Sequence, residues 1–145
     1  MAVPRWVTVS TLALSVVAFG ISAYLTYAHY ADPTSLACPD TGTINCTKVT
    51  TSSYAVIFGI PVAVFGLAWA AAVTAINVPW AWRSAPRWVH PLRLALVAGG
   101  AGMVLYLVYV ELFRIGAICL WCTGVHVTAV ALFTVVLLSR PSEAE

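Results

Sequence analysis

Charged side chains are scarce in this chain of 145 residues. Aspartate, glutamate, lysine and arginine together make up 8% of it, whereas a soluble domain carries about a quarter. Apolar residues account for 61% of the positions. This shortage of charge excludes a soluble globular domain and predicts a membrane protein. The formal net charge of +2 gives no reason to expect a nucleic acid or an acidic partner.

Other common features are also missing from the sequence. It has no internal repeat and no low-complexity tract, which excludes a repeat array. The first apolar run is longer than the roughly 7–15 apolar residues of a signal peptide and lacks a small-x-small cleavage site. We therefore expect a retained helix. No stretch remains for a soluble domain, so a single membrane domain is expected over 1–145.

Four apolar runs are long enough to cross a hydrocarbon core, which takes about 20 residues. They cover residues 6–30, 54–76, 92–113 and 118–138. The loops between them are short. The pattern therefore predicts an all-α integral membrane protein, a four-helix bundle with a cysteine-containing outer loop between its first and second helices.

Positive residues lie mostly at one set of helix ends. Five arginines occupy those ends, and two positive residues occupy the other set: Arg5, Arg83, Arg87, Arg93 and Arg140 against Lys48 and Arg114. Short cytoplasmic loops retain positive charge. Both termini and the middle loop are therefore expected in the cytoplasm. The loop over 31–53 and the turn over 111–116 are expected on the outer, oxidising side, where disulfides persist.

The cysteines form two pairs on that outer side. Cys119 and Cys122 are three residues apart where the fourth run begins, so on a helix they share a face near its N-terminus. The positive end of the helix dipole stabilises a thiolate, which is the attacking species in disulfide exchange. The spacing therefore favours a redox pair, with a static disulfide or buried thiols as the alternative.

Seven residues separate Cys38 from Cys46, and Pro39, Gly42 and Asn45 among them indicate an irregular, mobile loop. Such a loop can present one cysteine to a soluble thiol protein and bring the other to the second pair. Four cysteines allow three pairings, and the pattern does not choose among them. A permanent structural disulfide between Cys38 and Cys46, which would only order the loop, remains an alternative. No metal is expected, because this spacing is wider than zinc sites use.

The order and spacing of these motifs resemble the vitamin K epoxide reductases and their bacterial homologues. The resemblance covers residues 6–138. It rests on the segment from Cys38 to Cys46, on Ser52, on the Ile57-Phe58-Gly59-Ile60-Pro61 stretch and on the Cys119-Leu120-Trp121-Cys122 motif.

The resemblance implies a quinone site near the outer surface, with menaquinone or ubiquinone as electron acceptor. Cys38 would meet an external thiol protein, Cys46 would attack the second pair at Cys119, and Cys122 would lie beside the quinone. The implied enzyme is a thiol:quinone oxidoreductase of the cell inner membrane. It reoxidises a thioredoxin-fold, DsbA-like protein and so supports disulfide formation in exported proteins. This chain ends at Glu145 without the fused thioredoxin domain of many bacterial members, so the partner is expected in trans.

The same resemblance indicates quinone-binding residues at Ser52, Ala55 and Phe58. Vertebrate enzymes have an asparagine at the place of Ala55 and a tyrosine at the place of His126, so quinone reduction is favoured over reduction of vitamin K epoxide. His126 lies one helical turn below Cys122. An ionisable group within a span is a functional candidate, with a histidine bonded to a neighbouring helix as the alternative.

Other polar side chains lie near the outer end of the third run. Tyr106 and Tyr109 can each donate a hydrogen bond to a quinone oxygen, although core or interfacial tyrosine is the alternative. Glu111 and Arg114 are spaced i,i+3 and are expected to form a solvated pair of little energetic weight at the outer rim.

Two further functions stay open on the sequence. A DsbB-like enzyme has four spans and four cysteines and catalyses the same net reaction. It places its CxxC in the first outer loop, however, which is the reverse of the order here. The chain can also be a non-catalytic four-span scaffold whose disulfides brace its outer loops. Reducing the cysteines of a scaffold would lower its stability, and no quinone would turn over.

Overall fold

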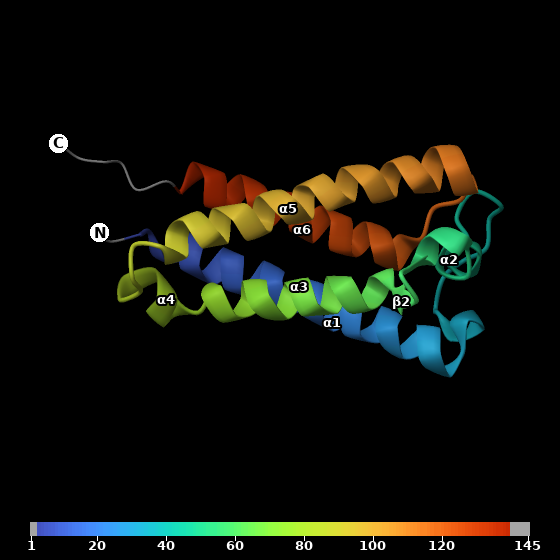
Figure 1. Cartoon of the computed structure of the whole chain (residues 1–145), viewed down its shortest axis with the longest axis horizontal. Helices are drawn as coiled ribbons and strands as arrows, with labels where there is room; N and C mark the ends of the chain where they lie inside the picture. Colours follow the sequence, from blue (N-terminus) through green and yellow to red (C-terminus); the bar gives the residue numbers. More distant parts are fainter. Residues whose placement is uncertain (1–2, 140–145) are drawn as a thin grey trace.

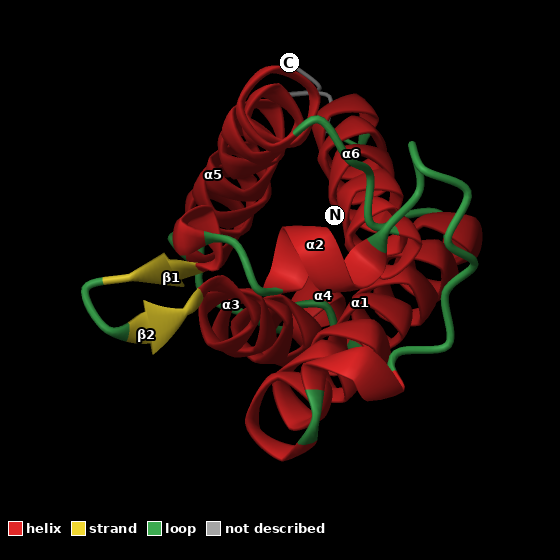
Figure 2. Ribbon diagram, turned by 90° about the vertical axis from the view of Figure 1, so that its right-hand side faces the viewer, coloured by secondary structure: helices red, strands yellow, loops and turns green. Residues whose placement is uncertain are grey.

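A computed structural model describes residues 3–139 of the chain. Four long helices run side by side along the molecule (Figure 1): α1 (Arg5–Ala31), α3 (Val62–Ile76), α5 (Val89–Tyr109) and α6 (Leu120–Leu138). Seen end-on they form a ring (Figure 2). Helix α1 packs against α3 and α6, and α5 packs chiefly against α6.

The two ends of the bundle differ in composition. The end that holds the start of α1, the end of α6 and the short helix α4 (Pro79–Arg83) is here called the arginine end (Figure 1). The other, the cysteine end, holds η1 (Pro33–Ser35), α2 (Cys46–Thr50) and η2 (Ser53–Ala55). Arg140, which entered the charge count, lies outside the described residues.

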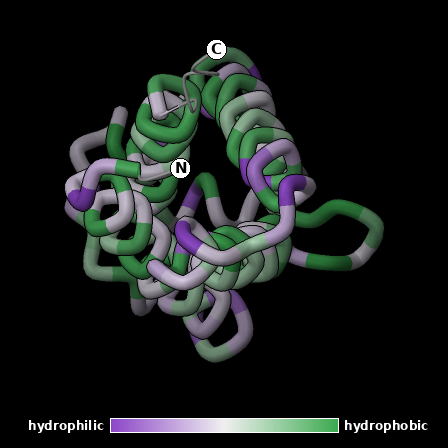
Figure 3. Tube along the Cα trace, turned by 90° about the vertical axis from the view of Figure 1, so that its left-hand side faces the viewer, coloured by the Kyte–Doolittle hydropathy of each residue, from purple (hydrophilic) through white to green (hydrophobic). Residues whose placement is uncertain are grey.

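Three helical segments in the described part of the chain are long and apolar enough to cross a membrane. They are Arg5–Ala31, Val89–Ile115 and Leu120–Leu138. The fourth long helix, α3, has 15 residues and so spans roughly 22 Å, less than the roughly 30 Å of a hydrocarbon core. Figure 3 shows the helices mostly in the colours of apolar residues. The protein is thus a largely helical membrane protein with three membrane-length helices.

The second predicted span is wrong at its start. Residues 54–61 do not continue the helix, because they form the end of η2 and a small hairpin of β1 (Val56–Ile57) and β2 (Ile60–Pro61). Phe58 and Gly59 connect the strands with φ angles of 51° and 77°, as a two-residue hairpin turn requires. Helix α3 begins only after Pro61, which lacks an N–H to donate to a preceding turn. The hairpin projects sideways from the bundle beside α3 (Figure 2).

The buried face of α1 is built mainly from small residues. These recur every three or four positions and are Val7, Thr11, Ser15, Ala18, Ser22, Leu25 and Ala28. Small side chains let neighbouring helices approach closely in a membrane protein. The hydroxyls of Thr11 and Ser15 donate to carbonyls one turn earlier in the same helix. This face therefore packs against α3 and α6 without leaving those hydroxyls unsatisfied.

The arginine end is closed by a buried cation. The Arg93 guanidinium donates to the Ile76 carbonyl at 3.2 and 2.6 Å and to the Ala81 carbonyl at 3.2 Å. Its Cζ lies 3.6 Å from the centroid of the Trp82 ring. Arg93 is therefore a buried cap on the C-terminus of α3.

Candidate functional site

A disulfide joins the two cysteines of the loop between α1 and α3. Cys38 and Cys46 are bonded with a Cα–Cα separation of 6.1 Å, which selects one of the three possible pairings. A zinc site built from all four cysteines is incompatible with this bond. Cys46 is buried, whereas Cys38 is partly exposed. Helix α2 begins at Cys46 because the Asn45 side chain accepts a hydrogen bond from the Lys48 N–H at 2.9 Å.

A polar hollow of about 420 Å³ lies beside this disulfide. Its lining includes both cysteines together with Pro39, Asp40 and Lys48. The loop disulfide therefore borders a polar depression at the cysteine end of the bundle.

The second half of the loop is docked onto the segment that leads into α6. Asn45 donates its N–H to the Ile118 carbonyl at 3.0 Å, and Ile118 donates to the Thr43 carbonyl at 2.8 Å. Cys46 directly follows Asn45, and Cys119 directly follows Ile118. The hydrogen bond between Asn45 and Ile118 therefore brings the segments that carry the two cysteines together. Both also belong to one buried apolar cluster. This segment of the loop is therefore held against the start of α6 in the structure.

The first half of the loop is held by Trp121, which stands between the two cysteines of the CxxC motif. Its indole Nε1–H donates to the Ala37 carbonyl at 2.9 Å. The hydroxyl of Tyr24 accepts from the Ala37 N–H at 3.2 Å, and the Tyr24 and Trp121 rings meet edge to face with centroids 4.8 Å apart. Ala37 directly precedes Cys38. These contacts therefore fix the position of the loop cysteine over the CxxC.

The CxxC pair lies at the N-terminus of α6 as two free thiols. Cys119 is the N-cap, and its Sγ accepts a hydrogen bond from the Cys122 N–H at 3.3 Å. The thiol of Cys122 also donates toward Cys119, which lowers the pKa of Cys119 below its ordinary value although burial opposes this. The helix N-terminus acts in the same direction. The thiolate that disulfide exchange requires is therefore favoured at Cys119.

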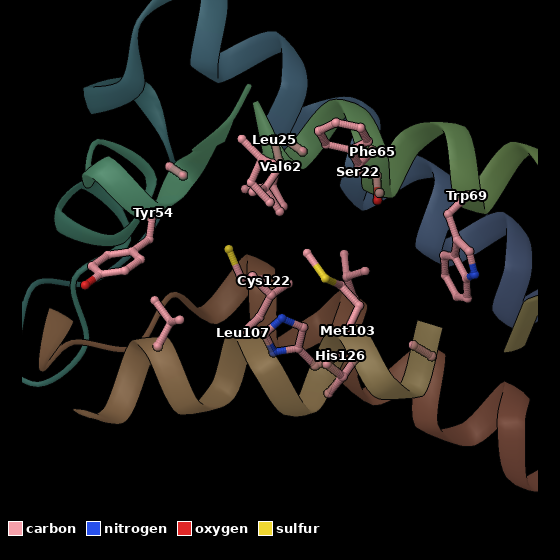
Figure 4. Close-up of a pocket in the computed structure, with 18 of the residues that line it drawn as sticks. Ser22, Leu25, Tyr54, Val62, Phe65, Trp69, Met103, Leu107, Cys122 and His126 are labelled. Carbon is pink, nitrogen blue, oxygen red and sulfur yellow. The ribbon is translucent and has the colours of Figure 1, made fainter. Parts of the chain in front are cut away.

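A large apolar cavity opens beside Cys122. It has a volume of about 560 Å³ and is lined from α3, α5, α6 and the segment before the hairpin. Tyr54 lies at one end and Trp69 at the other, while Cys122 and Met103 point into the space between (Figure 4). A cavity of this size with few polar groups is typical of a small-molecule site.

Most of the predicted quinone residues line this cavity. Ser52, Ala55, Phe58 and His126 do so together with Cys122. The Ser52 hydroxyl already donates to the Val49 carbonyl at 2.8 Å. Phe58 is 97% exposed at the hairpin turn and reaches only the rim. His126 is buried and lies on the cavity wall, one turn below Cys122 (Figure 4).

The structure does not bring Tyr106 and Tyr109 to the cavity. Both side chains are about half exposed, and Tyr109 packs against Phe113 with ring centroids 5.4 Å apart. The face of α5 that lines the cavity carries Met103 and Leu107 instead. The 3.6-residue period of the helix turns the tyrosines away from this cavity, and a contact between them and a quinone stays a prediction.

Sequence reasoning missed Glu111. It was expected to form a solvated pair with Arg114, but its exposure is 5% and it lines the cavity. Arg114 instead lies 6.0 Å from the centroid of the Tyr109 ring. Glu111 belongs to η3 (Val110–Ile115), a π-helical continuation of α5, and such widened turns are frequent at functional sites. The signal that could have identified Glu111 is the presence of an acidic residue inside an apolar run.

Residues 9–137 match the vitamin K epoxide reductase family. The match spans the loop disulfide, the CxxC pair and every residue named above as lining the cavity. It agrees with two cysteine pairs placed for exchange at one end of a membrane bundle. The chain therefore belongs to the vitamin K epoxide reductase family, a family of membrane thiol–disulfide oxidoreductases.

Proposed function

We propose that this protein is a thiol:quinone oxidoreductase that passes electrons from a soluble dithiol protein to a membrane quinone. The observation that carries the proposal is the position of the CxxC pair. Cys122 borders an apolar cavity of about 560 Å³, while Cys119 shares a buried cluster with Cys46 of the loop pair. One pair thus lies between a disulfide that partners can approach and a site that suits a ring compound.

Each transfer between the pairs is a thiol–disulfide exchange that breaks one S–S bond and forms another. The partner's thiolate attacks the more exposed Cys38 and releases Cys46. The partner's second thiol then resolves the mixed disulfide, which leaves both loop cysteines reduced. Cys46 attacks Cys119 of the oxidised CxxC and releases Cys122. Attack by Cys38 on Cys46 restores the loop disulfide and leaves Cys119 and Cys122 as thiols.

A quinone fits the residues of the cavity and, when bound, accepts two electrons and two protons. Ser52 and Ala55 border the cavity near the hairpin, and His126 offers an imidazole on the opposite wall. Trp69 forms the far end, where its Nε1–H donates to the Leu96 carbonyl at 2.9 Å. The lining between these groups is apolar, which suits the prenyl tail of menaquinone or ubiquinone.

The proposed location is the cell inner membrane, with the cysteine end outside and both termini in the cytoplasm. The arginine end carries Arg5, Arg83, Arg87 and Arg93, whereas the cysteine end carries Lys48 and Arg114, as the bias of positive charge toward cytoplasmic loops requires. Helix α3 would then be a fourth, short crossing. A short crossing is tolerated when it packs against longer neighbours or the bilayer thins locally.

The proposed partner is a thioredoxin-fold, DsbA-like protein that acts in trans. The hollow beside Cys38 carries one acidic and one basic side chain, Asp40 and Lys48, so we expect its docking to weaken with salt. Reoxidation of that partner would support disulfide formation in exported proteins.

Quinone reduction by the purified protein in detergent tests this function. Wild type, Cys122→Ser and Cys38→Ser are compared with a small dithiol and with a protein dithiol as donor. We expect Cys122→Ser to abolish turnover with both donors, by about 10³-fold or more. Cys38→Ser should fail chiefly with the protein donor. Absence of quinone reduction by the wild type, with a disulfide that persists throughout, would instead indicate a braced scaffold.

A further inference from the structure

Glu111 is an acidic side chain buried beside the CxxC pair. Its carboxyl lies within hydrogen-bonding range of the Cys119 backbone N–H. It also borders the cavity that Cys122 enters. The backbone around it is held in place, because the Glu111 carbonyl accepts hydrogen bonds from Gly116 at 2.9 Å and Ala117 at 3.2 Å. The carboxyl thus lies close to both thiols and to the proposed quinone site.

No cation faces this carboxyl in the part of the chain that the structure describes. The ionisable groups that share the cavity wall with it are Cys122, His126, His29 and Tyr54, and that wall carries no lysine or arginine. Arg114, on the same helical segment, lies at the Tyr109 ring. Lys48, on the neighbouring α2, is exposed. A negative charge at this site therefore has no opposite charge beside it.

Glu111 and the CxxC pair thus form a cluster that holds one negative charge readily and two only at high cost. Two like charges at short range in a low-dielectric site repel strongly, and each also loses its hydration. A thiolate of the CxxC pair and a Glu111 carboxylate therefore exclude one another. When the thiolate is present, the carboxyl carries a proton.

We propose that Glu111 supplies one of the two protons that accompany the electrons from the CxxC pair to the quinone. The inference rests on the proposed quinone reductase function. The reacting groups are the CxxC pair, which holds one thiol and one thiolate, the Glu111 carboxylic acid and the quinone. The S–S bond between the cysteines forms, and two electrons leave the sulfurs. One proton comes from the remaining thiol of the pair and one from Glu111, so the products are the disulfide, the Glu111 carboxylate and the quinol.

This step conserves charge within the site, because one negative charge moves from sulfur to carboxylate. The thiolate disappears as the disulfide forms, which removes the repulsion that kept Glu111 protonated. The next reduction of the CxxC pair brings two thiol protons into the site, and one of them returns to Glu111. The protons delivered to the quinone therefore derive from the donor dithiol.

A single-turnover experiment tests this role on the full chain with Cys38→Ser and Cys46→Ser, so that the CxxC pair alone is redox-active. The pair is reduced with a small dithiol, the dithiol is removed, and a short-tailed quinone is added. We expect Glu111→Gln to slow quinol formation about 10²-fold, the usual contribution of a positioned acid or base. Glutamine keeps the shape and the acceptor toward the Cys119 N–H. Glu111→Asp should recover part of the rate.

A second readout uses no quinone. The ultraviolet absorbance of the CxxC thiolate is followed against pH in the same background. The acid and the thiol compete for the one negative charge that the site holds, so we expect Glu111→Gln, which lacks the competing acid, to form the thiolate at lower pH than its parent. A residue that serves only to hold the fold would leave this titration unchanged. Arg114→Gln, in the same helical turn but outside the cavity, is the matched control and should change neither readout.

The possible outcomes separate the inference from the function on which it rests. If the parent protein does not reduce the quinone, the proposed function fails. If the parent reduces it and Glu111→Gln does so within twofold at every pH, Glu111 carries no proton and the inference is wrong. An unchanged thiolate titration in Glu111→Gln would also overturn it, whatever the rate.

Discussion

At the arginine end of the bundle one buried guanidinium ties together two carbonyls and an aromatic ring, whereas at the cysteine end the loop is held by separate neutral hydrogen bonds. Arg93 makes contacts of 2.6 to 3.2 Å with the carbonyls of Ile76 and Ala81. The cysteine loop relies on Trp121 at 2.9 Å and on the short bridge to Ile118.

This difference matches what each end has to do. A hydrogen bond to a charged group contributes about 1.5–3 kcal/mol, and a neutral one about 1 kcal/mol. The arginine end is therefore held by the stronger contacts, whereas the contacts at the cysteine end cost less free energy to break, as the proposed exchange between cysteine pairs requires. Each substitution below weakens one end of the bundle or the cavity between the ends, and each is compared with a control variant or a control reaction.

Removing the guanidinium should have the largest effect, and on stability alone. We expect Arg93→Met to lower the free energy of unfolding in detergent by about 3 kcal/mol, because the carbonyls of Ile76 and Ala81 lose their charged donor. Denaturant titration measures the loss. Arg87→Met, at an exposed position of the same end, should change it by less than about 0.5 kcal/mol. A reduced rate of cysteine exchange in folded Arg93→Met would show that the two ends are not independent.

Crowding the cavity between the ends should have the second-largest effect. A Cβ at Gly100 would lie 2.5 Å from Cζ2 of Trp69, so Gly100→Ala must displace the ring that forms the far end of the cavity. Overpacking typically costs about 2 kcal/mol, and we expect the quinone KM to rise about 30-fold. In Gly102→Ala the new methyl group meets no atom within 4 Å, so its KM should match that of the wild type. Equal effects of the two variants would place the quinone elsewhere.

His126→Leu separates the cavity from the cysteine relay. The side chain lies on the cavity wall, and loss of one hydrogen bond to the quinone should reduce turnover about tenfold. Exchange between the two cysteine pairs, followed by thiol alkylation without quinone, should be unchanged. Impairment of both reactions would refute this division of labour.

Weakening the loop clamp should have the smallest effect. Trp121→Phe keeps a ring against Tyr24 but loses the donor to the Ala37 carbonyl. Loss of about 1 kcal/mol from the docked loop should slow turnover about fivefold with a protein dithiol. With a small dithiol that reduces the CxxC directly, the rate should not change. Trp88→Phe, exposed at the arginine end, is the control, and a similar loss there would exclude a specific clamp.

The sequence predicted the helices and the cysteine pairs well because their signals are local. Apolar runs of about 20 residues mark membrane helices, and the CxxC spacing marks a redox pair at a helix start. It failed at residues 54–61, where an apolar stretch resembles helix in composition although the Phe58-Gly59 turn and Pro61 form a hairpin. Composition alone does not separate a short apolar strand from a helix.

The candidate site was less predictable because it depends on contacts between distant segments. The phase of α5 decides that Met103 faces the cavity while Tyr106 faces outward, and the π-helical turn then directs Glu111 inward. The i,i+3 spacing that predicted an exposed pair of Glu111 and Arg114 assumes a regular α-helix, so it cannot detect that turn. The docking of the loop likewise depends on Ile118, which is remote in sequence and carries no recognisable motif.

The central claim is that electrons pass between the pairs through Cys46 and Cys119, and disulfide trapping tests it most directly. In Cys38→Ser combined with Cys122→Ser, each pair keeps only the cysteine assigned to the transfer. Mild oxidation followed by peptide mapping should find an intramolecular disulfide between Cys46 and Cys119 in most molecules. If both thiols stay free under conditions that oxidise the wild-type pairs, the two cysteines do not meet and the relay is wrong.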